Sequence, residues 1–219
     1  MKKAIIVVIL LMLVFISGGL EAQEETEESV EETNEETVQL KAGFLEYLED
    51  TIELSEGITI TKGEITVLAR QGEYFREEKK AELEEEVEMS FEQGEIISRE
   101  LTALLQENRY VFQQEVQFTR NEGEREFILR APYLELNQDE DTFAAQEGVE
   151  IEYDERELIA NEADYEGETE ELVLTGDVLI EETNGDWISG DRAVFFLDEE
   201  GDNNFEVEGN VELEVDISS

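Results

Sequence analysis

Residues 170–180 read Glu170-Glu171-Leu172-Val173-Leu174-Thr175-Gly176-Asp177-Val178-Leu179-Ile180, two alternating runs joined by a Gly-Asp step. Such runs have the period of two that is typical of strands with one buried face. The step recurs along the chain as a β-branched residue that follows a Gly or an acidic or amide residue and has an apolar residue two positions later. These anchors are Ile58, Val87, Val116, Val149, Val178 and Val211, and their spacings are 29, 29, 33, 29 and 33 residues. Self-similarity at this period predicts a stacked repeat architecture.

Each repeat has a second landmark, a small or apolar residue about 11 positions after the anchor, with partners three and five residues further on. The sets are Leu40, Gly43, Leu45; Ala69, Gly72, Tyr74; Ser98, Leu101, Ala103; Ala131, Leu134, Leu136; Ala160, Ala163, Tyr165; and Gly190, Ala193, Phe195. Gly, Asn and Asp cluster between the runs, at 121–123, 137–139, 184–186 and 200–204, where tight turns need them. Each repeat therefore supplies about two short strands. The only proline, Pro132, predicts an edge position or a bulge.

Two stretches have helix-like composition. Residues 77–88 are rich in Glu, Lys, Ala and Leu, and residues 99–108 place leucines at helical spacing. The repeat nevertheless puts Val87 and Val116 in equivalent positions, and tertiary pairing commonly overrides local propensity. We therefore predict strands in both stretches.

The N-terminus has the layout of a secretory signal. Met1-Lys2-Lys3 is positive, residues 4–16 are an unbroken apolar run, and residues 17–22 offer small residues for a peptidase. A helix over residues 4–16 spans ~20 Å and one ending at Leu20 about 25 Å, both short of the ~30 Å hydrocarbon core of a bilayer. We predict a signal peptide over residues 1–22 that is cleaved after Ala22. The alternative is a retained inner-membrane anchor formed by residues 4–20.

Residues 23–37 contain eight Glu, no basic residue and almost nothing apolar. Such a stretch cannot bury enough surface to order itself, which predicts an acidic disordered tether. The folded domain is expected to span residues 38–219, long enough for one continuous core.

Composition narrows the possible functions. The chain has no His and no Cys, which removes His-dependent nucleophilic triads, thiolate zinc sites and a lipoprotein anchor. Its 61 acidic and 15 basic residues give a formal charge of -46, which repels nucleic acid and anionic membrane surfaces. Because the screening length falls to ~3 Å at 1 M salt, this charge favours a salt-rich setting.

Acidic clusters such as 139–141 and 198–200 could in principle serve glycoside hydrolysis or hold Ca²⁺ or Mg²⁺. With so many carboxylates, however, neighbouring acids are expected everywhere by chance, and no EF-hand or Gly-Asp calcium repeat is present. We predict no enzyme activity, no catalytic residue, no cofactor and no specific metal site.

Two units carry a family resemblance. Residues 158–165 (Leu-Ile-Ala-Asn-Glu-Ala-Asp-Tyr) are followed by residues 172–178 (Leu-Val-Leu-Thr-Gly-Asp-Val), and residues 187–195 by residues 205–211. Both units have a small-x-x-Ala-x-aromatic step and then a Gly-[Asn/Asp]-Val step. This pattern resembles the OstA-like family, which includes the periplasmic lipopolysaccharide-transport proteins LptA and LptC and the N-terminal domain of LptD. The similarity is clear over residues 149–213 and traceable from Leu40 onward.

The resemblance implies an all-β fold, an open β-jellyroll or β-taco of about 12–16 short antiparallel strands, in the periplasm. It implies a non-catalytic bridge or chaperone whose interior carries the acyl chains of lipopolysaccharide or a related glycolipid from the inner to the outer membrane. Unpaired end strands would add other OstA-like proteins, or further copies of this chain, end to end. The inward positions expected to line one apolar lipid-binding strip are Ile58, Ile60, Val87, Met89, Val116, Phe118, Val149, Ile151, Val178, Ile180, Val211 and Leu213.

The charge limits how a lipid could bind. Because lipopolysaccharide head groups are anionic, affinity must come from acyl chains, at ~0.8 kcal/mol for each buried methylene. Two alternatives stay open: an LptC-like component anchored by residues 4–20, and an acidic extracytoplasmic structural or adhesive β-solenoid with a dry interior.

Overall fold

A computed structural model describes residues 38–122, 125–197 and 204–215. The described residues all belong to one compact unit. The expected signal peptide, anchor and acidic tether lie outside the described residues. So do the acidic cluster at 198–200 and most of the turn at 200–204.

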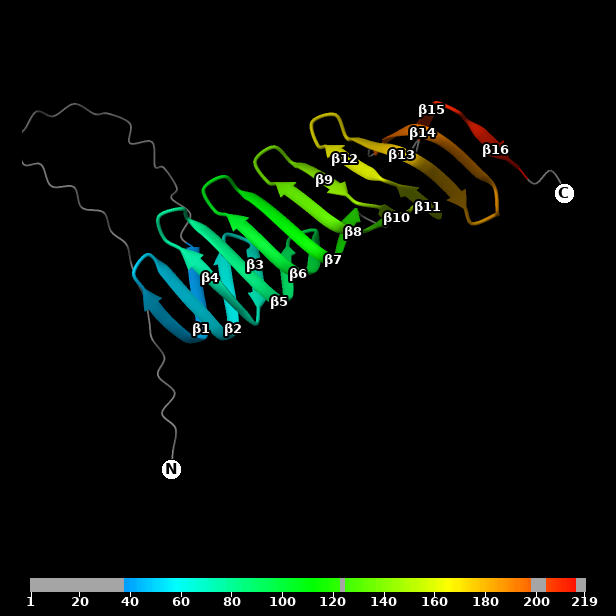
Figure 1. Ribbon diagram of the computed structural model, residues 1–219. Coiled ribbons are helices and arrows are strands. Elements are labelled where there is room, and N and C mark those ends of the chain that lie inside the picture. Colours follow the sequence, from blue (N-terminus) through cyan, green and yellow to red (C-terminus); the bar gives the residue numbers. More distant parts are fainter. Residues whose placement is uncertain (1–37, 123–124, 198–203, 216–219) are drawn as a thin grey trace, which may run out of the picture. The chain divides into compact units, whose positions relative to one another are not determined.

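Every element of the described residues is a strand (Figure 1). The strands are β1 (Val38–Leu48), β2 (Thr51–Lys62), β3 (Ile65–Ala69), β4 (Gln71–Phe75), β5 (Lys80–Phe91), β6 (Gly94–Leu104), β7 (Arg109–Glu122), β8 (Arg125–Asn137), β9 (Thr142–Gln146), β10 (Val149–Tyr153), β11 (Arg156–Ala160), β12 (Glu162–Glu166), β13 (Glu171–Glu182), β14 (Trp187–Phe196), β15 (Phe205–Glu208) and β16 (Glu212–Glu214). All their pairings are antiparallel and join them into one sheet. The predicted fold class, an all-β open jellyroll of about 12–16 antiparallel strands, is confirmed.

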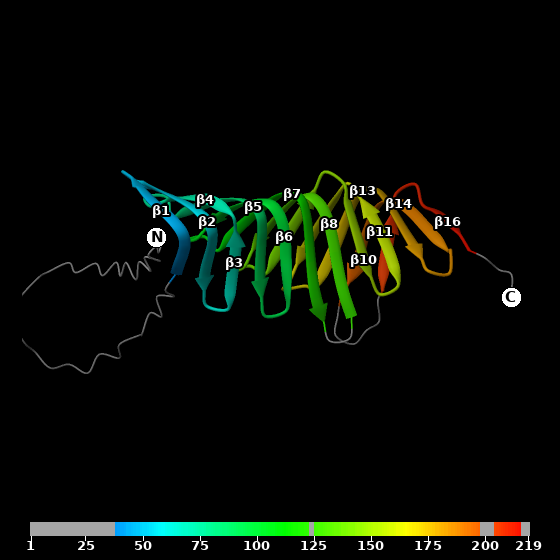
Figure 2. The same cartoon turned by 90° about the horizontal axis from the view of Figure 1, so that it is seen from below.

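The sheet is folded over itself into two layers, because the long strands bend in the middle and pair in both. Figure 2 looks onto the strands of one layer, with those of the other behind them. We call the layers A and B. Layer A is formed by residues 44–48, 51–54, 71–75, 80–84, 100–104, 109–113, 133–137, 142–146, 162–166, 171–175, 192–196 and 205–208. Layer B is formed by residues 38–42, 58–62, 65–69, 87–91, 94–98, 116–122, 125–131, 149–153, 156–160, 178–182, 187–190 and 212–214.

The corner between the layers has the same backbone in every repeat. Two consecutive residues with positive φ stand directly before each anchor, as at Gly176 (80°) and Asp177 (49°) before Val178. The other pairs are Glu56-Gly57, Glu85-Glu86, Gln114-Glu115, Glu147-Gly148 and Gly209-Asn210. Left-handed backbone is easy for Gly and tolerated by Asn and Asp. This conformation accounts for the Gly-[Asn/Asp]-Val step in the sequence.

Polar pairs tie neighbouring corners together. The Arg70 guanidinium donates two hydrogen bonds of 2.6 Å to the Glu86 carboxylate. One repeat later Arg99 donates to Glu115 at 2.8 Å, and Asn161 donates to Asp177 at 3.2 Å in the same relative position. The Glu115 pairing lowers the pKa of that carboxyl, chiefly through its hydrogen bond with Arg99. Because these groups are exposed, each pair adds little stability.

Most of each helix-like stretch is strand, as predicted: residues 80–88 belong to β5 and residues 99–104 to β6, while residues 77–79 and 105–108 form turns. Ala81 and Leu83 of β5 and Leu101 and Ala103 of β6 alternate into the core, each no more than 2% exposed. Burial of this alternating face outweighs the helical propensity of the glutamates and leucines. Pro132 lies where the register of β8 against β7 shifts, between the pairs Gln113–Tyr133 and Val116–Ala131. Of the two predicted environments, it is therefore a bulge within an internal strand.

We expect Gly148→Ala and Gly57→Ala each to lower the free energy of unfolding by about 1 kcal/mol. Both glycines have positive φ, and an added Cβ would meet nothing within 4 Å, so the loss is conformational rather than steric. Urea denaturation measures it. The control is Glu150→Ala, an exposed strand position without positive φ, and an equal loss there would contradict this role of the corners.

Candidate functional site

The interior between the layers is lined by unbroken rows of apolar side chains. In layer B one row runs through directly paired residues from end to end: Leu40, Ile60, Val67, Met89, Ile96, Phe118, Leu129, Ile151, Leu158, Ile180, Ile188 and Leu213. Side chains opposite one another in a sheet share a face, so this row is one continuous strip. It contains six of the twelve predicted strip residues.

Ten of the twelve predicted residues are buried in a single core. Ile58, Ile60, Val87, Met89, Val116, Phe118, Val149, Ile151, Val178 and Ile180 are each no more than 5% exposed. The other two are not buried: Val211 is 49% and Leu213 64% exposed. Leu213 of β16 pairs with Ile188 and so lies on the inner face, but no described strand pairs with the other side of β16. Both lie in or next to β16, the last described strand of layer B, and their role in a lipid-binding strip stays a prediction.

Layer A supplies two further rows that the predicted strip lacks. One joins Leu45, Leu54, Gly72, Leu83, Leu101, Phe112, Leu134, Ala145, Ala163, Leu174, Ala193 and Val207, and the other Tyr47, Ile52, Tyr74, Ala81, Ala103, Tyr110, Leu136, Phe143, Tyr165, Leu172, Phe195 and Phe205. In the sequence, the second landmark of each repeat indicated both of these layer A rows. Its partners at three and five residues, from Gly72 and Tyr74 to Ala193 and Phe195, are members of these rows.

Aromatic rings join the layers at mid-length. Phe118 of layer B lies edge-on to Phe143 of layer A, with ring centroids 5.6 Å apart. Phe143 stacks on Tyr165 at 5.2 Å, and Phe127 and Phe91 lie 5.9 and 6.1 Å from Phe118. Such contacts stabilise the packing beyond area burial alone, by about 0.5–1.5 kcal/mol for each pair.

The hairpin tips of both layers lie on the side of the unit opposite the corners. Along that side no described strand passes from one layer to the other. We call this side the mouth. At its middle is a cavity of about 430 Å³, between the tips at Lys62–Ile65 and Phe91–Gln93 of layer B and the tip at Leu136–Phe143 of layer A. Met89, Phe118, Phe143 and Tyr165 also line it, so its apolar floor is part of the interior.

Basic side chains of layer B cross the mouth to layer A. The Lys62 ammonium donates a hydrogen bond to the Asn108 side-chain oxygen, and the Asn108 amide donates to Asp139 at 2.8 Å. The Arg120 guanidinium lies 5.9 Å from the ring centroid of Tyr165. Further along, Arg156 lies 5.6 Å from the ring of Phe205 in layer A, and it pairs within layer B with the Glu182 carboxylate at 3.2 Å. The contacts with Asn108, Tyr165 and Phe205 join the two layers without backbone pairing.

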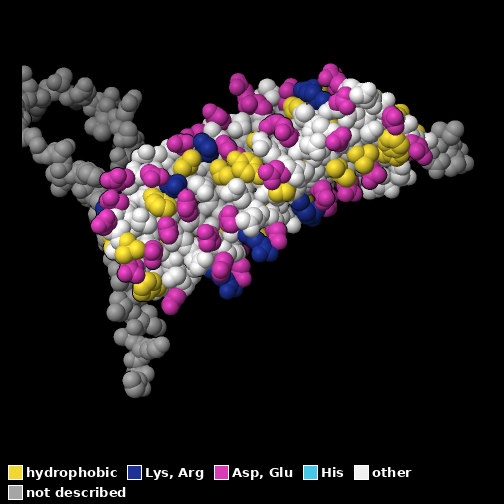
Figure 3. All heavy atoms as spheres, in the orientation of Figure 1, with side chains coloured by type: hydrophobic (Ala, Val, Ile, Leu, Met, Phe, Trp, Pro, Cys, Tyr) yellow, Lys and Arg dark blue, Asp and Glu magenta, His cyan; other side chains and the backbone are white. Residues whose placement is uncertain are grey.

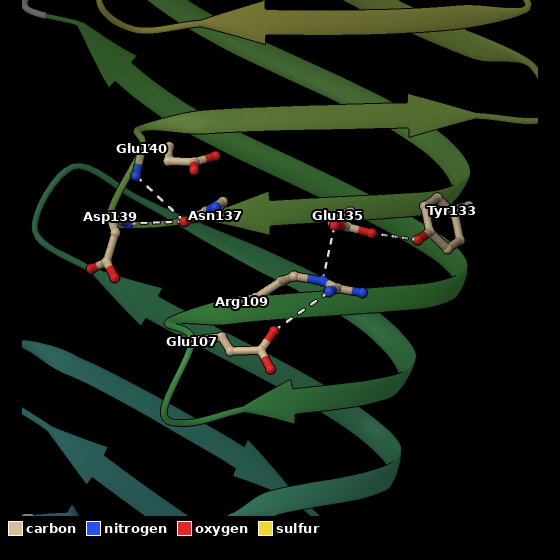
Figure 4. A network of polar contacts seen from close by, with 7 residues as sticks. All are labelled: Glu107, Arg109, Tyr133, Glu135, Asn137, Asp139 and Glu140. Atoms are coloured by element: carbon tan, nitrogen blue, oxygen red, sulfur yellow. Dashed lines mark hydrogen bonds and ion pairs between the residues drawn. The ribbon is translucent and has the colours of Figure 1, made fainter.

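The layer A side of the mouth is shaped by a local network (Figure 4). The Asn137 side-chain oxygen accepts hydrogen bonds from the backbone N–H groups of Asp139 (3.1 Å) and Glu140 (3.4 Å), which fixes the turn that leads to β9. Beside it, Arg109 pairs with Glu135 at 2.9 Å, and the Tyr133 hydroxyl donates to the same carboxylate at 2.8 Å. Burial raises the pKa of the Tyr133 hydroxyl, and its hydrogen bond to Glu135 acts in the same direction.

Both ends of the interior expose apolar side chains. In β1, Leu45 and Tyr47 begin the two layer A rows and are 43% and 47% exposed. At the other end, β15 and β16 are the last strands of the two layers. Within the described residues, each end therefore presents a strand edge without a pairing partner beside the open end of the apolar rows.

The outer faces are strongly acidic, as Figure 3 shows for one side. Four glutamates of layer A stand in one cross-strand line, because Glu46 pairs with Glu53, Glu53 with Glu73, and Glu73 with Glu82. Elsewhere on this face, burial raises the pKa of Asp164, and the nearby Glu162 raises it further. Like charges directly opposite one another destabilise a sheet.

Within the described ranges, no group of three His, Cys, Asp or Glu residues is arranged to hold a metal ion. The described part of the chain also contains no helix long and apolar enough to cross a membrane. The alternative anchor, residues 4–20, lies outside that part.

Comparisons with known proteins give one kind of match. No family model matches the sequence, and no curated protein matches it. Among solved structures, 17 chains match. One is LptH from Pseudomonas aeruginosa, described as the LptA-homologous periplasmic component of the lipopolysaccharide transport device, with 8% identity and a TM-score of 0.30 over 83% of this chain and 96% of that chain. LptA belongs to the family that residues 149–213 resemble, but a TM-score this low supports no transfer of function.

We expect Glu73→Gln to raise the free energy of unfolding by about 0.5 kcal/mol at low salt, because it removes a charge flanked by two others. The gain should vanish near 1 M salt, where the screening length is ~3 Å. Denaturant titrations at both salt concentrations measure it. Glu95→Gln is the control, since Glu95 stands opposite Ser90 and Thr119, and the same gain there would show that only net charge matters.

Proposed function

We propose that this protein is an exported, non-catalytic lipid carrier that holds the acyl chains of lipopolysaccharide or a related glycolipid between its two layers. The observation that carries the proposal is the row from Leu40 to Leu213, apolar at every step and paired across the whole stack. Its Gly-[Asn/Asp]-Val corners are the motif that resembles the OstA-like family.

The distribution of polarity suits a carrier of chains. Ser98 is the only buried polar residue of the described core, and its hydroxyl donates to the Glu100 carbonyl at 2.9 Å. An acyl chain between the layers would thus meet apolar surface along its whole path, gaining ~0.8 kcal/mol for each buried methylene. The carboxylates lie on the outer faces, so a head group would remain outside the interior. Lipid would move by exchange along the rows, with no turnover chemistry.

The same architecture supports assembly end to end. β1 is the edge strand of both layers at one end, and β15 and β16 are the edge strands at the other. A second jellyroll, from this chain or from another protein of the same fold, would pair with these edges and continue the apolar rows. Such head-to-tail contacts between non-identical surfaces build chains of molecules, which fits a periplasmic bridge.

Photocrosslinking during export tests the carrier. A photoreactive residue at Val149 or Val178, each 1% exposed in the core, should crosslink to lipid. The matched control is Glu150, which neighbours Val149 but is exposed on the outer face. Crosslinks from Glu150 without any from the two valines would place the lipid on the surface and refute an interior path.

Self-association tests the ends. Leu45→Glu and Leu213→Glu should each abolish growth of particle size with concentration in high salt, because each puts a charge at an open end. Both positions are already exposed, so the fold should survive. Ile97→Glu is the control, since Ile97 is 41% exposed but faces outward from the middle of layer B. Light scattering measures the size, and equal behaviour of all three variants would contradict edge pairing at the ends.

A further inference from the structure

Two buried side-chain nitrogens of the described residues have no hydrogen-bond acceptor, Nε of Arg109 and Nη1 of Arg156. A buried donor without an acceptor is costly and rare in folded proteins, so each one needs a physical explanation. Arg109 has one, because its Nε lies 2.9 Å from the Glu135 carboxylate in an ion pair on the outer face of layer A. Arg156 donates from Nε to Glu182, and its Nη1 is left without an acceptor.

Arg156 lies where the apolar interior meets the mouth. It comes two residues before Leu158, a member of the layer B row, so both side chains lie on the inner face of β11. Across the interior, its guanidinium lies 5.6 Å from the ring centroid of Phe205, the last residue of a layer A row. A chain that lies on these rows and leaves through this part of the mouth therefore passes the guanidinium.

A cavity of about 360 Å³ opens beside Arg156 at the tips of two layer B hairpins, where residues 153–157 and 181–183 line it. The cavity is within the usual size of ligand pockets. Arg156 is the one cation among its lining residues, and every other charged residue of the lining is a carboxylate. The cavity therefore has room for the first polar atoms that follow an apolar chain, but its field repels an anion.

We propose that Nη1 of Arg156 donates a hydrogen bond to the carbonyl oxygen of the ester or amide group that joins an acyl chain to its head group. The inference rests on the proposed function, because the chain itself would lie on the apolar rows. Like the valines of the core, Nη1 is reached only when an entering chain parts the layers. Arg156 would thus distinguish acyl lipids from ether-linked amphiphiles of the same length, which have no carbonyl at this position.

A neutral carbonyl suits this donor better than a phosphate does. Glu182 already offsets the charge of Arg156 at 3.2 Å, and a carbonyl leaves that ion pair intact. A phosphate would meet the carboxylates of the cavity and the field of a chain with a net charge of -46. Because Nη1 has no acceptor to exchange, the protein loses no hydrogen bond when it forms the new one.

A matched pair of neutral amphiphiles tests the role of Arg156: 1-lauroylglycerol and 1-dodecylglycerol, which differ only in a carbonyl in place of a methylene. Both are titrated below their aggregation concentrations against protein loaded with the neutral dye N-phenyl-1-naphthylamine, and the loss of dye fluorescence measures displacement. The ester should bind about tenfold more tightly than the ether, as expected for one hydrogen bond from a charged donor. Equal affinities would mean that Nη1 is merely hydrated in the lipid-bound protein and would overturn the proposal.

Variants locate the preference. Arg156→Met with Glu182→Gln removes the donor and its ionic partner together, so that no charge is left unpaired, and the preference for the ester should disappear. The control is Arg192→Met with Glu208→Gln, the same change in an ion pair of 3.4 Å on the outer face of layer A, which should keep the preference. If the first variant does not fold, Arg156→Lys takes its place. Lys keeps a cation beside Glu182 but lacks the second arm of the guanidinium, so the preference should fall by about threefold or more.

The outcomes separate Arg156 from the carrier. An unchanged preference in the Arg156 variants, or an equal loss in the Arg192 control, would overturn the role of Arg156, while binding of both amphiphiles would still support the carrier. If neither amphiphile displaces the dye, the proposed function fails together with this inference.

Discussion

The pair of left-handed residues at each corner is the constraint on which the rest of the structure depends. An extended strand belongs to a single layer, and only a sharp bend lets one strand pair in layer A and again in layer B. Because the bend recurs directly before each anchor, at Gly176-Asp177 as at Glu147-Gly148, all corners fall on one side of the unit. The apolar faces of the layers then face each other, and the hairpin tips collect on the opposite side as the mouth. The rows, the mouth and the open ends are all consequences of this placement.

Most of the fold could be predicted from the sequence because its signals are local. Four of the six corners contain Gly in the left-handed pair, and the repeat spacing places the other two, Glu85-Glu86 and Gln114-Glu115. An alternating strand shows its buried face in its own sequence, as Leu172 and Leu174 do. The repeat also predicted strands in the two stretches with helix-like composition, because it places Val87 and Val116 in equivalent positions. Val211 and Leu213 show where this reasoning stops. Their pattern is that of an interior strand, but burial also requires a neighbouring strand, and among the described residues β16 pairs with β14 alone.

The mouth could not be predicted from the sequence, because its parts are far apart in the chain and share no motif. Lys62 and Asn108 are separated by 46 residues, and Asn108 and Asp139 by 31, so only the folded layers bring them together. Which hairpin tips reach across depends on their lengths and on the twist of the sheet. The layer A rows are a different case. Tyr74, Tyr165 and Phe195 are partners of the second landmark in the sequence repeat. They could have been predicted as interior residues by assuming that both strands of each repeat face the same core.

The few basic residues gather where the two acidic outer faces converge. Arg70 and Arg99 lie at the corners, and Lys62, Arg120 and Arg156 lie at the mouth. In the middle of a layer, a carboxylate such as Glu73 points into solvent and is screened by salt. At the edges, carboxylates of both layers approach each other, so a cation there relieves more repulsion than it would elsewhere. At the cavity in the mouth, for example, Lys62 and Arg120 lie among three carboxylates, Glu64, Glu92 and Asp141, so that two cations offset much of the negative charge there.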